Sequence, residues 1–113
     1  MTDPTPAELV RRYSAITTAV TELFERRLPA NTGDIRGMGL LLGIDLVTDR
    51  ATRAPVIRLV KRVVLRAFRA GLLLGTSWDW QTLILMPPLN LDDAAMDRAL
   101  AILDETLGTV RGS

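Results

Sequence analysis

Residues 35–47 read IRGMGLLLGIDLV, and this stretch decides how the rest of the chain is interpreted. Asp45 is the only ionisable side chain in its apolar second half. A nearly unbroken apolar run of this length is typical of a strand that is covered on both faces. Side chains alternate along a strand, so Leu42, Ile44 and Leu46 would share one face. We therefore predict that residues 35–47 form one central strand.

Three glycines, Gly37, Gly39 and Gly43, lie within this stretch. A glycine allows the backbone to twist, to bulge or to approach another backbone closely. Glycine-rich loops can also bind phosphate, but those loops follow a strand and open a helix. Because these glycines open a strand instead, we interpret them as structural.

The composition is that of a small globular chain. With 113 residues it forms one domain at most, and it can bury about two thirds of the surface that its unfolded form exposes. Hydrophobic residues make up 48% and the mean hydropathy is +0.20, yet no apolar run approaches the roughly 18 residues of a membrane span. The N-terminus lacks the pattern of a secretory leader, so we expect a cytoplasmic protein with no membrane partner.

The residue types that are missing narrow the chemistry. There is no cysteine, which excludes disulfides and thiolate chemistry. There is also no histidine, the commonest general base at neutral pH and the commonest metal ligand. The 14 basic residues nearly balance the 13 acidic ones, and a net charge of +1 gives no field that would attract nucleic acid. We therefore expect neither a metal site nor a nucleic-acid partner.

Local signals predict a first helix near the N-terminus. Thr5 and Glu8 form a capping box, with Pro6 at the first helical position. The helix should end near Leu28, because Pro29 disfavours helical geometry in the residue before it.

A second helix is predicted from Pro55, after a polar loop at residues 48–54, to a stop at Gly71. Its buried side is expected to comprise Val56, Ile57, Val60, Val63, Val64, Ala67 and Phe68. Its other side carries five cations and no acid, namely Arg58, Lys61, Arg62, Arg66 and Arg69. We favour a solvated face over a binding patch, because cations near a helix C-terminus are stabilised by the helix dipole.

Two short buried strands are predicted at residues 72–74 and 82–86. The connection between them contains both tryptophans of the chain, Trp78 and Trp80. Large amphipathic rings in a loop can line a pocket or an interface, or they can cover the edge of the sheet, and both interpretations stay open.

Pro87 and Pro88 end the last strand, since proline cannot donate to a strand ladder. Asn90 or Asp92 then caps a final helix. The predicted order is helix, strand, helix, strand, strand, helix. It suits a single α+β domain over residues 1–113, with a small, mostly antiparallel, three-stranded sheet flanked by helices.

Three segments resemble motifs of the class III aminotransferases, which are pyridoxal-phosphate enzymes of fold type I. Residues 35–45 resemble the family's V-R-G-x-G-L-x-x-G-x-E/D motif, residues 70–74 its R-G-L-L/V segment, and residues 86–92 its P-P-L-x-I-T/S segment. The motif residues carried over are Arg36, Gly37, Gly39, Gly43, Pro87 and Pro88. Three motifs in the family's order make a specific match over roughly residues 9–110.

The resemblance covers only the family's C-terminal small domain and implies a three-stranded antiparallel sheet with flanking helices. In the family, the large domain supplies the Schiff-base lysine, the aspartate at the pyridine nitrogen and the phosphate-binding groups. None of these matches a position here, so we expect the large cofactor-binding domain to be absent and no residue of this chain to be catalytic. Lys61, the only lysine, lies on the polar side of a helix, and we interpret it as ordinary surface.

The resemblance thus implies part of a transaminase that moves an amino group between an amine or amino acid and a keto acid. The intact enzyme would bind pyridoxal phosphate, contain the large domain and form a homodimer, whereas this chain alone would bind no cofactor and be inactive. The alternative is a non-catalytic interaction module that uses the basic helix 56–69 or the tryptophan loop 76–81. The sequence leaves open whether the chain is a fragment, a truncated gene product or a free-standing domain.

One departure from the family pattern bears on the substrate. Many members that act on amino acids carry an arginine three residues before the first proline, where it receives the substrate carboxylate. Ile84 stands there and offers no donor, which favours a substrate without a carboxylate on that side. Ser77, Trp78, Trp80 and Ile84 would then form the substrate entrance. The alternative is that Ile84 points into the core, with the strand shifted by one residue.

Overall fold

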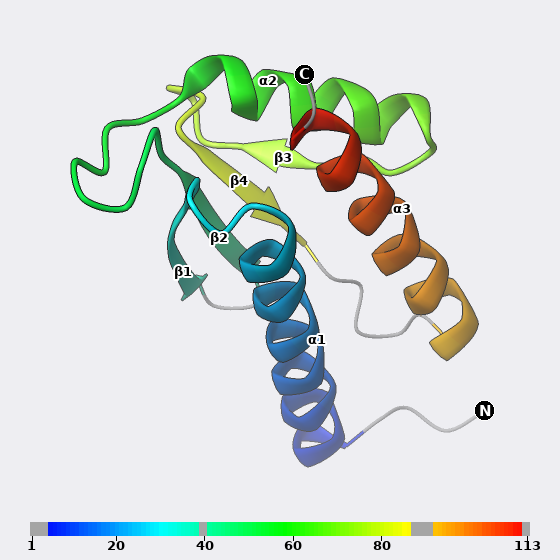
Figure 1. The fold of residues 1–113 in the computed structure, drawn as a ribbon. Coiled ribbons are helices and arrows are strands. Elements are labelled where there is room, and N and C mark those ends of the chain that lie inside the picture. Colours follow the sequence, from blue (N-terminus) through cyan, green and yellow to red (C-terminus); the bar gives the residue numbers. More distant parts are fainter. Residues whose placement is uncertain (1–4, 39–40, 87–91, 112–113) are drawn as a thin grey trace.

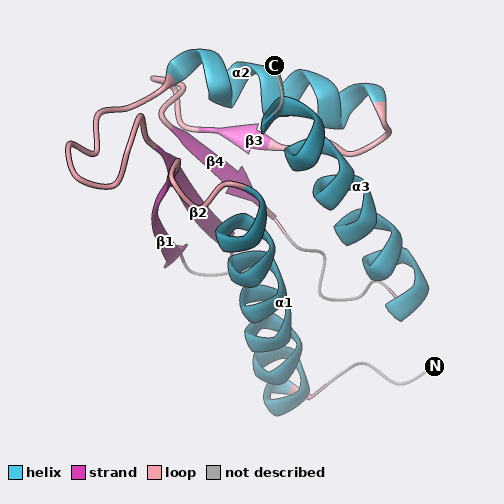
Figure 2. Ribbon diagram, in the orientation of Figure 1, coloured by secondary structure: helices cyan, strands magenta, loops and turns pink. Residues whose placement is uncertain are grey.

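The computed structural model describes residues 5–38, 41–86 and 92–111 (Figure 1). The helices are α1 (Pro6–Arg27), α2 (Ile57–Arg69) and α3 (Asp93–Arg111), and the strands are β1 (Thr32–Met38), β2 (Leu41–Leu46), β3 (Gly75–Thr76) and β4 (Thr82–Leu85). Helices and strands alternate along the chain without separating into two halves (Figure 2). The predicted α+β class is confirmed.

The sheet is antiparallel throughout and has the strand order β1-β2-β4-β3. The antiparallel arrangement was predicted, but the sheet has four strands rather than three. The additional strand arises because residues 35–47 do not form one strand. They contribute to both β1 and β2, which pair as a hairpin with Arg36 opposite Gly43 and Met38 opposite Leu41.

The hairpin corrects the interpretation of the glycines. Gly37 lies in β1 opposite Leu42, and Gly43 lies in β2 opposite Arg36, so these two glycines belong to two paired strands rather than to the entry of one long strand. Gly39 itself lies outside the described residues.

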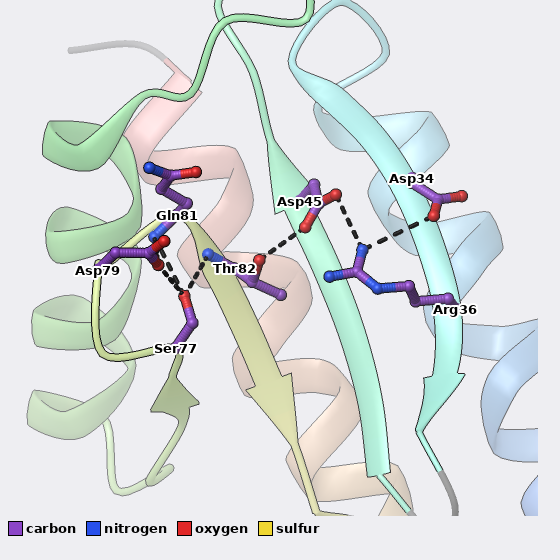
Figure 3. Close-up of polar contacts among 7 residues, drawn as sticks. All are labelled: Asp34, Arg36, Asp45, Ser77, Asp79, Gln81 and Thr82. Carbon is purple, nitrogen blue, oxygen red and sulfur yellow. Dashed lines mark hydrogen bonds and ion pairs between the residues drawn. The ribbon is translucent and has the colours of Figure 1, made fainter.

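All three helices lie on one face of the sheet, behind it in the view of Figure 3. Leu42, Ile44 and Leu46 share that face, as predicted, and each is fully buried. They join the inward side chains of the three helices in a continuous core. The prediction that the stretch is covered on both faces is wrong for the described residues, because its other face carries no helix.

Helix α1 begins where its local signal places it. The Glu8 amide donates to Thr5 Oγ1 and the Thr5 amide donates to Glu8 Oε2, and each hydrogen bond is 3.2 Å long. The helix ends at Arg27, with Leu28 as its C-cap, as predicted. Its buried residues are Ile16, Val20, Leu23 and Phe24.

Helix α2 departs from the prediction at its start and on its apolar side. It begins at Ile57, because Pro55 is bridged to Val47 and so lies before the helix. Phe68 was expected to be buried but is 62% exposed. The helix rests on the core through Val60 and Ala67, and Phe68 is rotated about 100° from Ala67 around the helix axis.

The segment at residues 72–74 is not a strand, which corrects the prediction. The strand follows it at Gly75–Thr76 and pairs with β4. The leucines of the segment reflect burial rather than pairing, since Leu74 lies in the core and Leu72 packs against it. The predicted strand at residues 82–86 is present as Thr82–Leu85.

Helix α3 is capped by Asp92, whose Oδ1 accepts a hydrogen bond from the Ala95 amide at 2.7 Å. This confirms one of the two predicted caps. Asn90, the other candidate, lies outside the described residues, as do Pro87 and Pro88. Within the described residues, no helix combines the length and apolar character that crossing a bilayer requires.

Candidate functional site

The face of the sheet that bears no helix is the candidate site, and we call it the open face. One row of residues crosses it from strand to strand: Arg36, Gly43, Ile84 and Gly75. Ile84 is half-buried, with a glycine opposite it on each neighbouring strand. Ile84 is thus the one apolar side chain in this row, and the positions on both sides of it have no side chain.

The register decides which way Ile84 points. Leu83, the residue before it, is opposite Ile44, and both are fully buried on the helical side. Side chains alternate along a strand, so Ile84 lies on the open face. The alternative in which Ile84 points into the core does not hold.

Polar side chains of β1, β2 and β4 interact with one another across the open face, and we call them the polar ladder (Figure 3). Arg36 Nη1 lies 2.8 Å from Asp45 Oδ2 and 3.6 Å from Asp34 Oδ2. The other oxygen of Asp45 accepts a hydrogen bond from the Thr82 hydroxyl at 2.7 Å. The two ends of the first motif, Arg36 and Asp45, are therefore joined across the hairpin.

The polar ladder borders a small pocket that sequence reasoning missed. The pocket has a volume of about 90 Å³, and its lining includes Asp34, Asp45, Arg53 and Gln81. The motif marked Asp45, but nothing in the sequence indicated that Asp34 or Gln81 lies beside it. These residues come from separate segments, so only the pairing of the strands brings them together.

The tryptophan loop (residues 76–81) is closed by a hydrogen-bond network around Ser77 (Figure 3). Ser77 Oγ donates to Asp79 Oδ1 at 2.6 Å and accepts from the Thr82 amide at 3.1 Å. The Ser77 hydroxyl lowers the pKa of the Asp79 carboxyl, so that the carboxylate form is favoured. The Trp80 amide also donates to the Ser77 carbonyl at 3.0 Å.

The four residues of the predicted substrate entrance differ in their surroundings. Trp78 projects into solvent and is 92% exposed. Trp80 lies against α2, with Lys61 Nζ 5.2 Å from the centroid of its ring. Ser77 is engaged in the loop network, and Ile84 lies on the open face. In this chain the four do not converge on one pocket among those described.

A cavity lined only by apolar residues lies elsewhere in the structure. It has a volume of about 220 Å³ and is bordered by α1, α3 and residues 72–74. Its lining residues are Ile16, Val20, Leu72, Leu73, Leu74, Leu85, Met86, Met96, Ala99, Leu100 and Leu103. Such a lining can accept an apolar group but provides no donor, acceptor or charge from a side chain.

The described residues do not fit pyridoxal phosphate or a metal ion. A lysine that reacts with a carbonyl is activated by a desolvated pocket or by a neighbouring cation, whereas Lys61 is an exposed residue of α2 over the Trp80 ring. No group of three or more Asp and Glu side chains in the described part of the chain is arranged to hold a metal ion.

Comparisons with known proteins give a consistent picture. No family profile matches the chain. The leucine/methionine racemase of Thermococcus litoralis is 36% identical over 78 residues, which are 69% of this chain and 17% of the racemase. The taurine–pyruvate aminotransferase of Bilophila wadsworthia is 39% identical over 84 residues, which are 69% of this chain and 18% of that enzyme.

The fold has close counterparts among solved structures. A structure described as a transaminase with L-Ala superposes with a TM-score of 0.76 at 26% identity, covering 94% of this chain and 24% of that one. The chain therefore spans less than a fifth of the length of these two curated relatives, and about a quarter of the solved structure.

Proposed function

We propose that this chain, which resembles a segment of the aminotransferases in sequence and in fold, serves as the C-terminal small domain of a class III transaminase. The observation that supports the proposal is how the two chains align: the superposition covers 94% of this chain but only 24% of the solved transaminase. The intact enzyme would move an amino group between an amine or amino acid and a keto acid. It would be a cytoplasmic homodimer.

The cofactor would belong to the rest of that enzyme. Pyridoxal phosphate supplies the electron sink for reactions at the carbon that bears the amino group. The residues of this chain do not fit it, so a large domain must provide the reactive lysine and the phosphate site. The 113 residues alone are then inactive.

The role of this chain would be to present its open face to the substrate. Helices cover the other face, whereas Ile84 on this one is flanked by Gly43 and Gly75 and can be approached closely. The nearest cation in the same row is Arg36, two strand spacings or about 10 Å away. Asp34 and Asp45 already engage it, so a carboxylate beside Ile84 would meet no free donor in that row. This supports an amine-like substrate on that side.

The experiment that tests the proposal restores the missing part. If the reading frame upstream, or a neighbouring gene, encodes a large domain with a cofactor lysine, co-expression should give a complex with transaminase activity. The purified chain alone, mixed with pyridoxal phosphate, should give only the visible spectrum of the free cofactor. A saturable new absorbance band that is lost in Lys61→Ala would contradict the proposal.

A second candidate, the non-catalytic interaction module, is favoured by the outer surface of α2. Arg58 and Arg69 are exposed there, and so are Leu65 and Phe68. Cations next to exposed apolar side chains are typical of a docking surface. This candidate gains if no large domain is encoded nearby, and it loses if co-expression yields turnover.

A further inference from the structure

The two tryptophans of the loop differ in what holds them. Trp78 is 92% exposed, whereas Trp80 is 39% exposed and lies under the ammonium group of Lys61. Trp80 also has a φ of +62°, in the left-handed region that a residue with a Cβ atom rarely adopts. A bulky residue persists in such a conformation only where its surroundings fix it.

The backbone of Trp80 is fixed by the loop itself. Its amide donates to the Ser77 carbonyl at 3.0 Å, and the following amide, that of Gln81, donates to Ser77 Oγ and to Asp79 Oδ1, each at 3.3 Å. These bonds set the path of the chain, but none of them involves the indole. The indole does contact Lys61, on a different element.

We infer that Lys61 is a positioning residue, whose ammonium group holds the Trp80 indole against α2 and so sets the orientation of the tryptophan loop. The distance of 5.2 Å from Nζ to the ring centroid is within the range of a cation–π interaction, and tryptophan is the ring that favours it most. The contact joins the middle of α2 to a loop that precedes β4 and Ile84.

Lys61, the only lysine of the chain, would thus have a structural role and would not react with a carbonyl. This role deepens the proposed function in one respect, since the loop would flank the substrate entrance of a transaminase. The contact itself is a property of these 113 residues. It can therefore fail while the proposed function stands, or hold while the proposed function fails.

The first test uses tryptophan fluorescence at micromolar concentration. Trp78→Phe leaves Trp80 as the only indole of the chain. In that background Lys61→Met, which keeps an unbranched side chain one atom shorter and without the charge, should shift the equilibrium between packed and released indole by roughly two- to fivefold. Quenching by acrylamide should rise accordingly, and Lys61→Arg, which retains a cation, should restore the parent value.

Two outcomes would overturn the inference. In one, Met and Arg at position 61 both give the quenching of the parent, so the ammonium group does not hold the ring. In the other, both raise it equally, so a feature of lysine other than its charge is responsible. Circular dichroism melts establish that each variant is folded at the temperature of measurement.

A second test needs no substitution at Lys61. Because the chain contains one lysine, amine reagents modify Lys61 and the N-terminus alone. Acetylation removes the positive charge, whereas reductive methylation retains it. Only the acetylated chain should show increased quenching of Trp80.

The same single lysine gives an unambiguous NMR signal. The ring current of the indole should move the Lys61 ε-methylene resonance upfield from that of a free lysine. Trp80→Leu should abolish this displacement, and Trp78→Phe should leave it unchanged. A Lys61 resonance at the free-lysine position in the unmodified chain would overturn the inference.

Discussion

The proposed preference for an amine-like substrate depends on one side chain, that of Ile84. Its neighbours in the row are glycines on both sides, so nothing but its own side chain defines what meets the open face at that point. A buried carboxylate without a donor loses its hydration without compensation. Under the proposed function, position 84 would therefore decide between an amine and an α-amino acid.

We predict that arginine at position 84 changes the preference of the intact enzyme. A hydrogen bond to a charged group contributes about 1.5–3 kcal/mol, so Ile84→Arg should raise kcat/KM for an α-amino acid, relative to an amine donor, roughly ten- to hundredfold. Ile84→Met, which is unbranched and has no donor, is the matched control and should leave the ratio near that of the parent. The idea fails if the parent already prefers the α-amino acid and arginine leaves that preference unchanged.

The ion pair of Arg36 and Asp45 is a more modest feature of the same face. Their side chains are 41% and 33% exposed, and pairs of this kind contribute about 0–1 kcal/mol. The pair therefore contributes little to stability, and its main effect is to join the side chains of β1 and β2. It also occupies Arg36, which would otherwise be available to a carboxylate.

Two helices that are distant in sequence are joined by Asp104. It lies in α3 and accepts a hydrogen bond from Arg27 Nε at the end of α1, while Arg26 Nη2 lies 3.4 Å away. The hydrogen bond from Arg27 lowers the pKa of the Asp104 carboxyl below its usual value. A carboxyl with a lowered pKa in the folded state stabilises that state when it is ionised.

The contact should make stability depend on pH. Its contribution is fully present above the usual carboxyl pKa near 3.8 and is lost as the pH falls through the lower pKa of the folded state. Urea unfolding between pH 6 and pH 2 should therefore show a smaller loss of stability in Asp104→Asn than in the parent, by about 1 kcal/mol or less. Asp97→Asn, on the same helix, is the control and should lose stability as the parent does. Equal pH profiles for the parent and Asp104→Asn would contradict this account.

The end of α2 depends on one backbone conformation. Gly71 follows the helix with a φ of +98°, and a Cβ added there would meet no atom within 4 Å. Any cost of a side chain is therefore conformational rather than a clash. Such a residue ends the helix and allows the chain to turn back toward β3.

We predict that Gly71→Ala destabilises the fold by about 1–2 kcal/mol, the cost of a left-handed conformation for a residue with a Cβ atom. Gly108→Ala makes the same chemical change inside α3, where a Cβ would lie 3.0 Å from the end of the Arg27 side chain, which must shift by a few tenths of an ångström. This control should be neutral or gain up to about 1 kcal/mol from helix propensity. The account is wrong if urea unfolding gives the two variants the same change.

The chain as a whole has more apolar surface than its fold covers. Large hydrophobic side chains remain exposed on several elements, among them Val10, Phe68, Leu73, Trp78 and Met86. Among the described elements, no helix lies on the open face of the sheet. Exposed apolar surface of this kind marks a lost partner or an interface.

We predict that the isolated chain associates with itself or precipitates as its concentration rises. Sedimentation should show a mass that increases with concentration, and a hydrophobic dye should bind. The double variant Phe68→Ser with Leu73→Ser should reduce both effects, because it removes two of the most exposed apolar side chains. A monomer at high concentration that binds no dye would count against the prediction.

The sequence by itself determined the features that depend on neighbouring residues. The capping box of α1, the Asp92 cap of α3 and the glycine stop of α2 each involve groups within a few positions of one another, so local chemistry is sufficient to predict them. The three motifs likewise indicated the resemblance to aminotransferases, and the alternation along β2 predicted that Leu42, Ile44 and Leu46 share one face.

Only the tertiary structure decided which segments meet. An apolar run does not reveal whether it pairs with itself, so residues 35–47 became a hairpin, and one face of the sheet was left without helices. The meeting of Arg36, Asp45 and Thr82, and that of Lys61 with Trp80, could not be predicted for the same reason. Strand pairing and helix packing join residues that are far apart in the chain, and their energies depend on partners that no local pattern specifies.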